Sequence, residues 1–72
     1  MISPLAYIDP EAQIGQNVEI APFVFIDRNV VIGDNNKIMS GAKILYGSRI
    51  GQGNTIFPGA VIGAIPQDLK FR

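Results

Sequence analysis

An isoleucine occupies every sixth position from Ile2 to Ile62, and this period limits the possible folds more than any other feature of the chain. The eleven positions of this isoleucine ladder are Ile2, Ile8, Ile14, Ile20, Ile26, Ile32, Ile38, Ile44, Ile50, Ile56 and Ile62. The residue four places after each of them is mostly small. A period of six fits neither an amphipathic helix, with its period of about 3.6, nor a hairpin sheet, whose side chains alternate. The chain must therefore coil, with two inward positions in each six-residue unit.

Glycine and asparagine mark the corner in most of the units. Seven of them lie three residues after a ladder isoleucine, at Asn17, Asn29, Asn35, Gly41, Gly47, Gly53 and Gly59. Both residue types tolerate positive φ, and a proline often stands just before this position, so each unit is a short strand followed by a turn. Three units close a triangular coil, and successive coils pair as parallel strands about 4.8 Å apart. The pattern predicts an all-β parallel β-helix of about four triangular coils over residues 1–63.

The composition excludes several classes of function. Six basic residues balance six acidic ones among 72, so no excess charge draws the chain to nucleic acid or to an anionic membrane. No apolar run approaches the roughly 18 residues of a membrane span, and the first residues lack a signal-peptide pattern, so we expect a cytoplasmic protein without stable membrane insertion. The absence of histidine and cysteine removes the usual zinc ligands and the commonest general base and nucleophile. We expect no metal, no cofactor and no catalytic residue within this segment.

One corner of the predicted coil is unusually apolar. Alignment of the chain at eighteen-residue offsets brings together Leu5, Tyr7, Phe23, Phe25, Met39 and Phe57. An exposed apolar ridge is unfavourable on a monomer, so we expect a homo-oligomer that buries this edge. Two alternatives remain open: these are ordinary scattered surface side chains, or another segment covers them.

The repeat fails after Ile62 and Gly63. Asp68 falls where the next ladder isoleucine belongs, and a carboxylate cannot be buried there without a partner. We therefore expect residues 64–72 to leave the β-helix as a loop, and interruptions of a solenoid are places where loops specialise for binding. From the residues alone, Gln67, Asp68 and Lys70 fit either a solvated surface loop or a substrate-binding site.

A resemblance favours the binding site. The run Gly63-Ala64-Ile65-Pro66-Gln67-Asp68-Leu69-Lys70-Phe71 resembles the Gly-x-x-Pro-Gln-Asp-Leu-Lys-Tyr segment of the UDP-N-acetylglucosamine O-acyltransferases of lipid A biosynthesis. The opening Ala6-Tyr7-Ile8-Asp9-Pro10-Glu11-Ala12 is similar to how these enzymes begin. The resemblance covers the whole chain, which would correspond to about the first quarter of such an enzyme. It also implies a left-handed helix, whereas ordinary parallel crossovers are right-handed.

The resemblance implies transfer of an (R)-3-hydroxyacyl group from acyl carrier protein to the 3-hydroxyl of UDP-N-acetylglucosamine, in a cytoplasmic homotrimer. The apolar edge would join the subunits, through Tyr7, Phe23, Phe25, Met39 and Phe57. The histidine that acts as general base in this family would lie beyond Arg72, so the segment alone is expected to be inactive. Of the family's substrate contacts, Gln67, Asp68 and Lys70 match here, while Phe71 replaces the more frequent tyrosine.

Other functions remain open. Hexapeptide repeats are shared by many acyltransferases, acetyltransferases and γ-class carbonic anhydrases, so the repeat alone indicates a fold and not a substrate. A non-catalytic β-helix scaffold is a further alternative. Ice binding is excluded because it would need rows of threonine, and Thr55 is the only threonine. Asp9, Glu11, Asp27 and Asp34 are expected at outward corners, where solvation explains them better than metal binding does.

Overall fold

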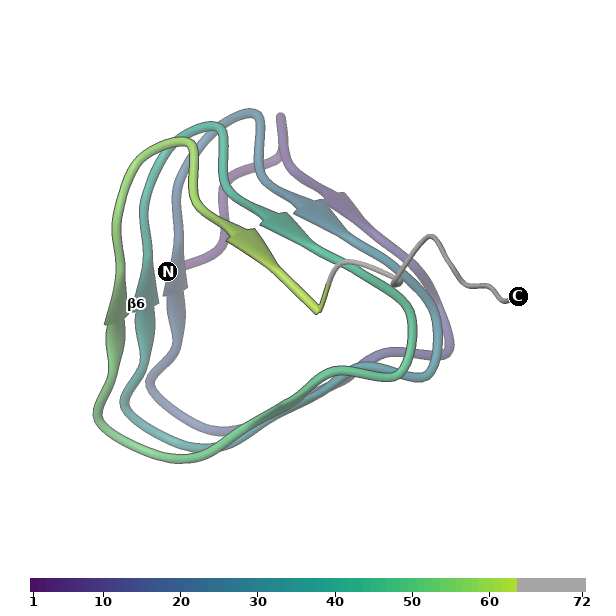
Figure 1. Ribbon diagram of the computed structural model, residues 1–72. Coiled ribbons are helices and arrows are strands. Elements are labelled where there is room, and N and C mark those ends of the chain that lie inside the picture. The colour runs from purple at the N-terminus through teal and green to yellow at the C-terminus, as the bar shows by residue number, and fades with distance from the viewer. Residues whose placement is uncertain (64–72) are drawn as a thin grey trace.

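The chain forms a triangular prism of stacked coils in the computed structural model, which describes residues 1–63 (Figure 1). Ten strands of two residues each make up its three faces. They are β1 (Tyr7–Ile8), β2 (Gln13–Ile14), β3 (Glu19–Ile20), β4 (Phe25–Ile26), β5 (Val31–Ile32), β6 (Lys37–Ile38), β7 (Lys43–Ile44), β8 (Arg49–Ile50), β9 (Thr55–Ile56) and β10 (Val61–Ile62). Every strand ends on a ladder isoleucine, so the six-residue period is the period of the strands. Among residues 1–63 there is no helix with the length and apolar character that a membrane crossing requires.

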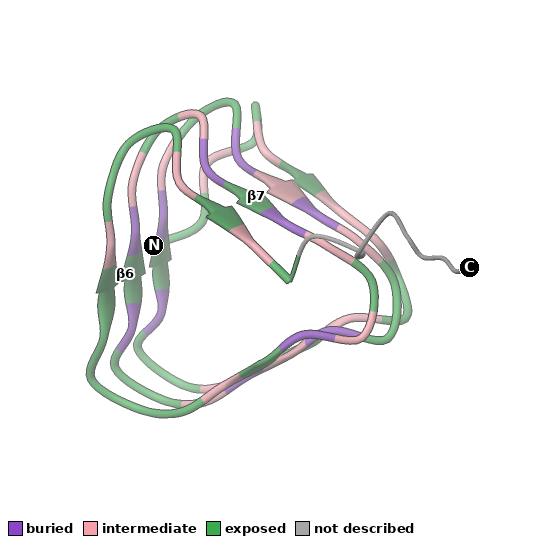
Figure 2. Cartoon of the chain, in the orientation of Figure 1, coloured by how far each residue is buried: buried purple, intermediate pink, exposed green. Residues whose placement is uncertain are grey.

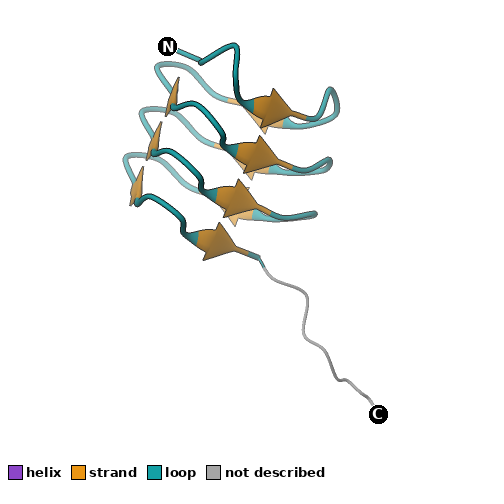
Figure 3. Ribbon diagram, turned by 90° about the horizontal axis from the view of Figure 1, so that it is seen from above, coloured by secondary structure: helices purple, strands orange, loops and turns teal. Residues whose placement is uncertain are grey.

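The strands pair in parallel between successive coils and form three sheets. Their orders are β1-β4-β7-β10, β2-β5-β8 and β3-β6-β9. The register is eighteen residues throughout, so that Ile8 lies beside Ile26 and Ile26 beside Ile44. Figure 3 shows three complete coils, with β10 beginning a further one, and Ile2 bridges to Ile20 at the opposite end. The coils form a left-handed parallel β-helix, which confirms the predicted fold and its hand.

The core consists of apolar side chains from the inward positions of the stacked coils. Figure 2 marks the buried residues along the ribbon. The fully buried members of the core are Val18, Ile20, Val24, Ile26, Val30, Ile32, Ile38, Ala42 and Ile44. All occupy one of the two inward positions of the six-residue unit. Ladder residues of the outer coils, such as Ile8 and Ile62, are only partly buried because a coil covers them on one side alone.

The corners use the backbone conformation that the glycines and asparagines indicated. Asn17, Asn29 and Asn35 have φ between 57° and 62°, and the glycines at the same position of later units have φ between 71° and 80°. This left-handed region costs little for glycine and is tolerated by asparagine. The predicted strand-and-corner unit is confirmed.

One inward position holds a polar residue, Asn36, which is 1% exposed. Its Nδ2 donates to the carbonyl oxygens of Gly33, at 2.9 Å, and Gly51, at 2.6 Å. Its Oδ1 accepts a hydrogen bond of 2.7 Å from the backbone N–H of Asn54. A single side chain thus satisfies three backbone groups and ties two successive coils together at the corner between the β5 and β6 faces.

Candidate functional site

The predicted substrate-binding residues Gln67, Asp68 and Lys70, and the loop over residues 64–72, lie outside the described residues. The last described residues before this segment are those of β10, followed by Gly63. β10 pairs with β7, which places Val61 beside Lys43 at the end of the described stack. Gly63, the last described residue, therefore lies next to the face formed by β1, β4, β7 and β10.

Gly63 makes a close approach to the coil below it. Its φ is 79°, and a Cβ atom there would overlap the Oγ of Ser48. Ser48 is buried, and its hydroxyl donates 2.7 Å to the carbonyl oxygen of Leu45. Only glycine combines this φ with this contact, so the position immediately before residues 64–72 is fixed by a local packing requirement.

The apolar corner lies along one edge of the prism, between the β3-β6-β9 face and the β1-β4-β7-β10 face. Leu5, Tyr7, Phe23 and Phe57 expose between 51% and 68% of their surface. Phe25 and Met39 are only partly exposed, which corrects the expectation that all six apolar residues form an exposed ridge. Phe25 is covered by the ring of Tyr7, and Met39 lines a groove described below.

The exposed side chains fall on two sides of this corner. Tyr7 and Phe25 are neighbours on the β1-β4 face, with ring centroids 5.3 Å apart and planes at 16°. Met39 and Phe57 lie at equivalent positions of later coils, on the side of the corner next to β6 and β9. Leu5 and Phe23 are stacked at the corner itself, where the Phe23 N–H donates 3.2 Å to the Leu5 carbonyl.

Phe23 adopts φ of 66°, which the sequence pattern did not reveal. It is the one residue among 1–63, apart from glycines and asparagines, with a positive φ. For a bulky side chain this conformation is strained. Gly41 and Gly59 occupy the same position in the two later coils of this corner, where they avoid that cost. A signal did exist in the sequence, because Phe23 follows Pro22 at the corner position that carries Gly or Asn in seven other units.

Tyr7 carries a hydrogen-bonded phenol at the edge of the apolar corner. Its hydroxyl donates 3.2 Å to Oδ2 of Asp9. The negative charge of Asp9 raises the pKa of Tyr7 above its ordinary value, with smaller contributions from desolvation, the hydrogen bond and Asp27. The phenol therefore stays protonated at neutral pH and acts as a donor and not as a base.

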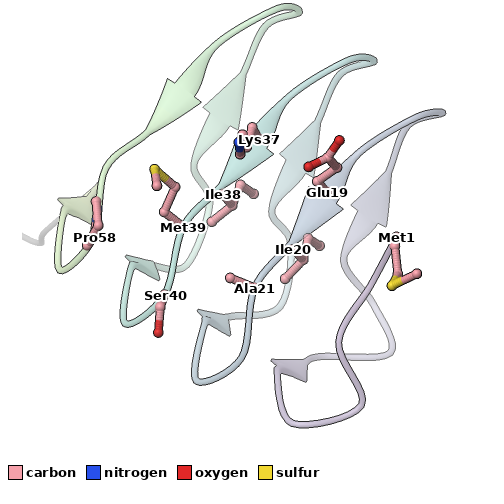
Figure 4. A pocket seen from close by; sticks show the side chains of 9 residues that line it. All are labelled: Met1, Glu19, Ile20, Ala21, Lys37, Ile38, Met39, Ser40 and Pro58. Carbon is pink, nitrogen blue, oxygen red and sulfur yellow. The ribbon is translucent and has the colours of Figure 1, made fainter.

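A shallow apolar groove of about 360 Å³ runs along the other side of the apolar corner, over β3 and β6 (Figure 4). Met1 lies at one end and Pro58 at the other, with Ala21 and Met39 along the corner side. Glu19 and Lys37, which are neighbours in the parallel register, border the opposite side. The groove has the dimensions and lining to receive one or two apolar side chains, and it holds no arrangement of groups that could perform acid–base chemistry.

Three of the four acidic residues discussed in the sequence analysis bind the backbone of the corners. The carboxylates of Asp9, Asp27 and Asp34 each accept a 2.8 Å hydrogen bond from a backbone N–H. Within residues 1–63, no three histidine, cysteine, aspartate or glutamate side chains come together as a metal site. Arg49 is occupied in the same way, because its guanidinium donates to the carbonyl of Asn29 in the coil below.

Comparison with known proteins agrees with the fold and with the family resemblance. The family model for bacterial transferase hexapeptide proteins, which spans six repeats, matches residues 29–64. Among solved structures, the chain is similar to LpxA, a UDP-N-acetylglucosamine acyltransferase from Bacteroides fragilis, with 88% sequence identity and a TM-score of 0.95. That similarity covers 100% of this chain but 28% of the LpxA chain, so the chain spans little more than a quarter of that protein. No curated protein matches the chain significantly.

The family match covers half of the chain. It falls on coils that contain the isoleucine ladder, corner residues with positive φ and parallel strand pairing. The chain belongs to the bacterial transferase hexapeptide family.

Proposed function

We propose that this chain is the N-terminal part of an acyltransferase that moves an (R)-3-hydroxyacyl group from acyl carrier protein to the 3-hydroxyl of UDP-N-acetylglucosamine. This is the first step of lipid A biosynthesis. The observation that carries the proposal is the 88% identity to LpxA over all 72 residues, together with a TM-score of 0.95. The Pro-Gln-Asp-Leu-Lys run at residues 66–70 narrows the proposal to one family, since the hexapeptide repeat by itself is common to enzymes with different substrates.

In this reaction the 3-hydroxyl oxygen of the sugar attacks the thioester carbonyl carbon. A carbon–oxygen bond forms, the carbon–sulfur bond breaks, and the thiol of the carrier protein leaves with the proton that the hydroxyl lost. The proton must pass through a general base, which the resemblance to the family implies to be a histidine, and the 72 residues contain no histidine. The segment alone is therefore expected to be inactive.

Within the segment we assign substrate binding to three residues of the loop. Asp68 would accept hydrogen bonds from hydroxyl or amide groups of the substrate, and Gln67 would support it. Lys70 would supply a positive charge near the anionic nucleotide or donor. These roles follow from the match of Gln67, Asp68 and Lys70 to the family motif.

We further propose that the enzyme is a cytoplasmic homotrimer joined through the apolar edge, which includes Tyr7, Phe23, Phe25, Met39 and Phe57. Exposed aromatic side chains on one edge of the prism support this assembly. Each copy exposes parts of Tyr7, Phe23 and Phe57 that together amount to roughly 350 Å², taking about 200 Å² for a whole aromatic side chain. Each subunit of a trimeric ring takes part in two interfaces and contributes roughly 800 Å² to a standard one, so these three residues would supply about a fifth of the area that a subunit buries.

The proposal is tested with the full-length chain and its Asp68→Ala and Asp68→Asn variants. Acyl transfer to UDP-N-acetylglucosamine is measured by mass spectrometry, and nucleotide-sugar binding is measured by calorimetry. We expect both variants to bind the sugar nucleotide at least 10-fold more weakly, because one charge-assisted hydrogen bond contributes about 1.5–3 kcal/mol. Glu11→Gln, which removes an exposed carboxylate at the corner between β1 and β2, serves as the matched control. Unchanged binding and turnover in both Asp68 variants would contradict the assignment.

A further inference from the structure

Two features of the apolar corner complement each other. Leu5 and Phe23 lie at the corner itself, where Phe23 is 68% exposed. The apolar groove lies beside the same corner, over β3 and β6. An exposed side chain at an edge and a depression beside that edge can form the two halves of a heterologous, head-to-tail interface, which closes into a ring when the rotation between copies closes.

We propose that Phe23 of one copy inserts into the groove of the next, between Ala21 and Met39, and that this contact holds the copies of the ring together. The inference rests on the proposed homotrimer and specifies its contact. The occupant of the groove is thus a second copy of this chain.

The levels of the two features along the prism agree with this packing. Rotation about an axis parallel to the stack leaves every coil at its own height. Phe23 lies just before β4, in the second coil, and the groove extends from Met1 across β3 and β6 to Pro58. The projection of one copy therefore reaches the level of its neighbour's groove without any shift along the axis.

The position of the groove favours a second copy over a later part of the same chain. In a solenoid, added coils stack on the end and lengthen the corner, and each repeat contacts only its neighbours. The described coils end at β10 and Gly63, whereas Leu5 and Phe23 belong to the first two coils at the opposite end of the stack (Figure 3). Further coils would thus extend the corner away from Phe23 and leave its ring uncovered.

The backbone at Phe23 supplies an independent reason to assign it a binding role. Its φ of 66° is unfavourable for a phenylalanine, and the same corner uses glycine at the equivalent positions of the next two coils. Neither the strained backbone nor the exposed aromatic ring of Phe23 stabilises the isolated chain. Strain of this kind is retained where it serves a function, and an interface that buries the ring provides one.

The contact is tested by cross-linking in the full-length chain, after replacement of any native cysteines. Chains carrying only Phe23→Cys are coexpressed with differently tagged chains carrying only Met39→Cys, so that any disulfide between these positions joins two copies. We expect the mixed cross-linked dimer to form in high yield under mild oxidation. Tyr46→Cys replaces Phe23→Cys in the matched control, because Tyr46 is also an exposed aromatic but lies at a different corner, and we expect no mixed dimer there.

A second measurement distinguishes the effect of the Phe23 ring on self-association from the effect of its backbone strain on folding. Phe23→Ala removes the ring and keeps the unfavourable φ, whereas Phe23→Gly removes both. We expect each variant to weaken self-association at least 10-fold in sedimentation experiments, and the dissociated Phe23→Gly chain to have the more favourable folding equilibrium, by about 5- to 30-fold.

The possible results discriminate between the proposals. Cross-linking between two Phe23→Cys chains in place of the mixed pair would overturn the groove contact, and so would wild-type self-association of both Phe23 variants. Equal folding equilibria of the alanine and glycine variants would overturn the strain argument. The proposed enzymatic function is judged separately, by acyl transfer in the unmodified chain, so its failure cannot be mistaken for a failure of the interface.

Discussion

Asn36 should be the most sensitive polar residue of the described coils, because three backbone groups depend on its side chain. Asn36→Val leaves the Gly33 carbonyl, the Gly51 carbonyl and the Asn54 N–H without the partner that the native amide supplies. Valine itself fits an inward position, since Val18 occupies the equivalent place one coil below. The substitution therefore tests the hydrogen bonds and not the shape of the site.

The magnitude follows from the burial of the three orphaned groups. Gly33 is partly buried. If water cannot reach its carbonyl oxygen, the loss of this hydrogen bond destabilises the protein by about 1–3 kcal/mol. Gly51 and Asn54 are exposed, so water can partly replace their hydrogen bonds to Asn36. The loss of each of these two bonds destabilises the protein by about 0.5–1 kcal/mol. We expect Asn36→Val to lower the free energy of unfolding by about 3 kcal/mol. Asn36→Asp should cost more, because its second carboxylate oxygen would face two carbonyl oxygens in a buried site.

The assay is urea denaturation of the full-length chain at one fixed protein concentration, combined with hydrogen exchange at the Asn54 amide. Ser40→Ala is the matched control, because the Ser40 hydroxyl also donates to a carbonyl of the previous coil, that of Pro22, but at an exposed corner. We expect this control to lose less than about 1 kcal/mol. The reasoning would be refuted by an Asn36→Val protein that unfolds within 1 kcal/mol of the wild type and keeps the Asn54 amide protected.

Two further substitutions test the corner packing and the electrostatics of the apolar edge. Gly15→Ala should destabilise the chain by about 1–3 kcal/mol, because the added methyl group would overlap Oδ1 of Asp34. Thermal unfolding should show no comparable loss for Gln13→Ala, an exposed position on β2, the strand that immediately precedes Gly15. A stability equal to wild type for Gly15→Ala would mean that the corner is looser than described. Titration by carbon NMR should find the pKa of Tyr7 above its ordinary value, and Asp9→Asn should lower it. Because the folded state raises the pKa of Tyr7, this residue contributes to stability below a pH of about 10, and the contribution is lost as the pH rises through the pKa of the folded state. An unchanged Tyr7 titration in Asp9→Asn would exclude Asp9 as the cause.

The architecture was largely predictable from the sequence because its determinants are local and repeat. A strict six-residue period leaves few alternatives to a coil, and the residues three places after the ladder isoleucines reported the corner conformation directly. The register of eighteen residues followed from the closure of three such units. The hand of the helix did not follow from these arguments, since the crossover rule favours the opposite hand, and it came from the resemblance.

The features that were missed depend on contacts between coils. Asn36 was counted as one of several small inward residues, and only the position of Gly33, Gly51 and Asn54 around it explains why a polar side chain belongs there. The partial burial of Phe25 and Met39 likewise depends on neighbours in adjacent coils. For Phe23, the rule for corner residues was available, but the exception to that rule was not recognised as strain.

The candidate site was predicted in a different way from the fold. Gln67, Asp68 and Lys70 were singled out by the failure of the repeat and by a motif, not by any geometry, and their binding roles stay predictions. The break itself has a physical basis, because a carboxylate at the phase of a ladder isoleucine cannot enter the apolar core. The chemistry of the loop cannot be deduced from periodicity, since periodicity describes only the scaffold.

The central claim is that these coils belong to an enzyme that acylates UDP-N-acetylglucosamine. The most direct measurement is acyl transfer by the full-length chain, with 3-hydroxyacyl carrier proteins of several chain lengths as donors and with UDP-glucose as a competing acceptor that lacks the N-acetyl group. We expect a product on UDP-N-acetylglucosamine acylated at the 3-hydroxyl, with one donor length preferred. Absence of product from a folded chain with every donor, or equal acylation of both acceptors, would contradict the claim and favour another hexapeptide transferase or a scaffold.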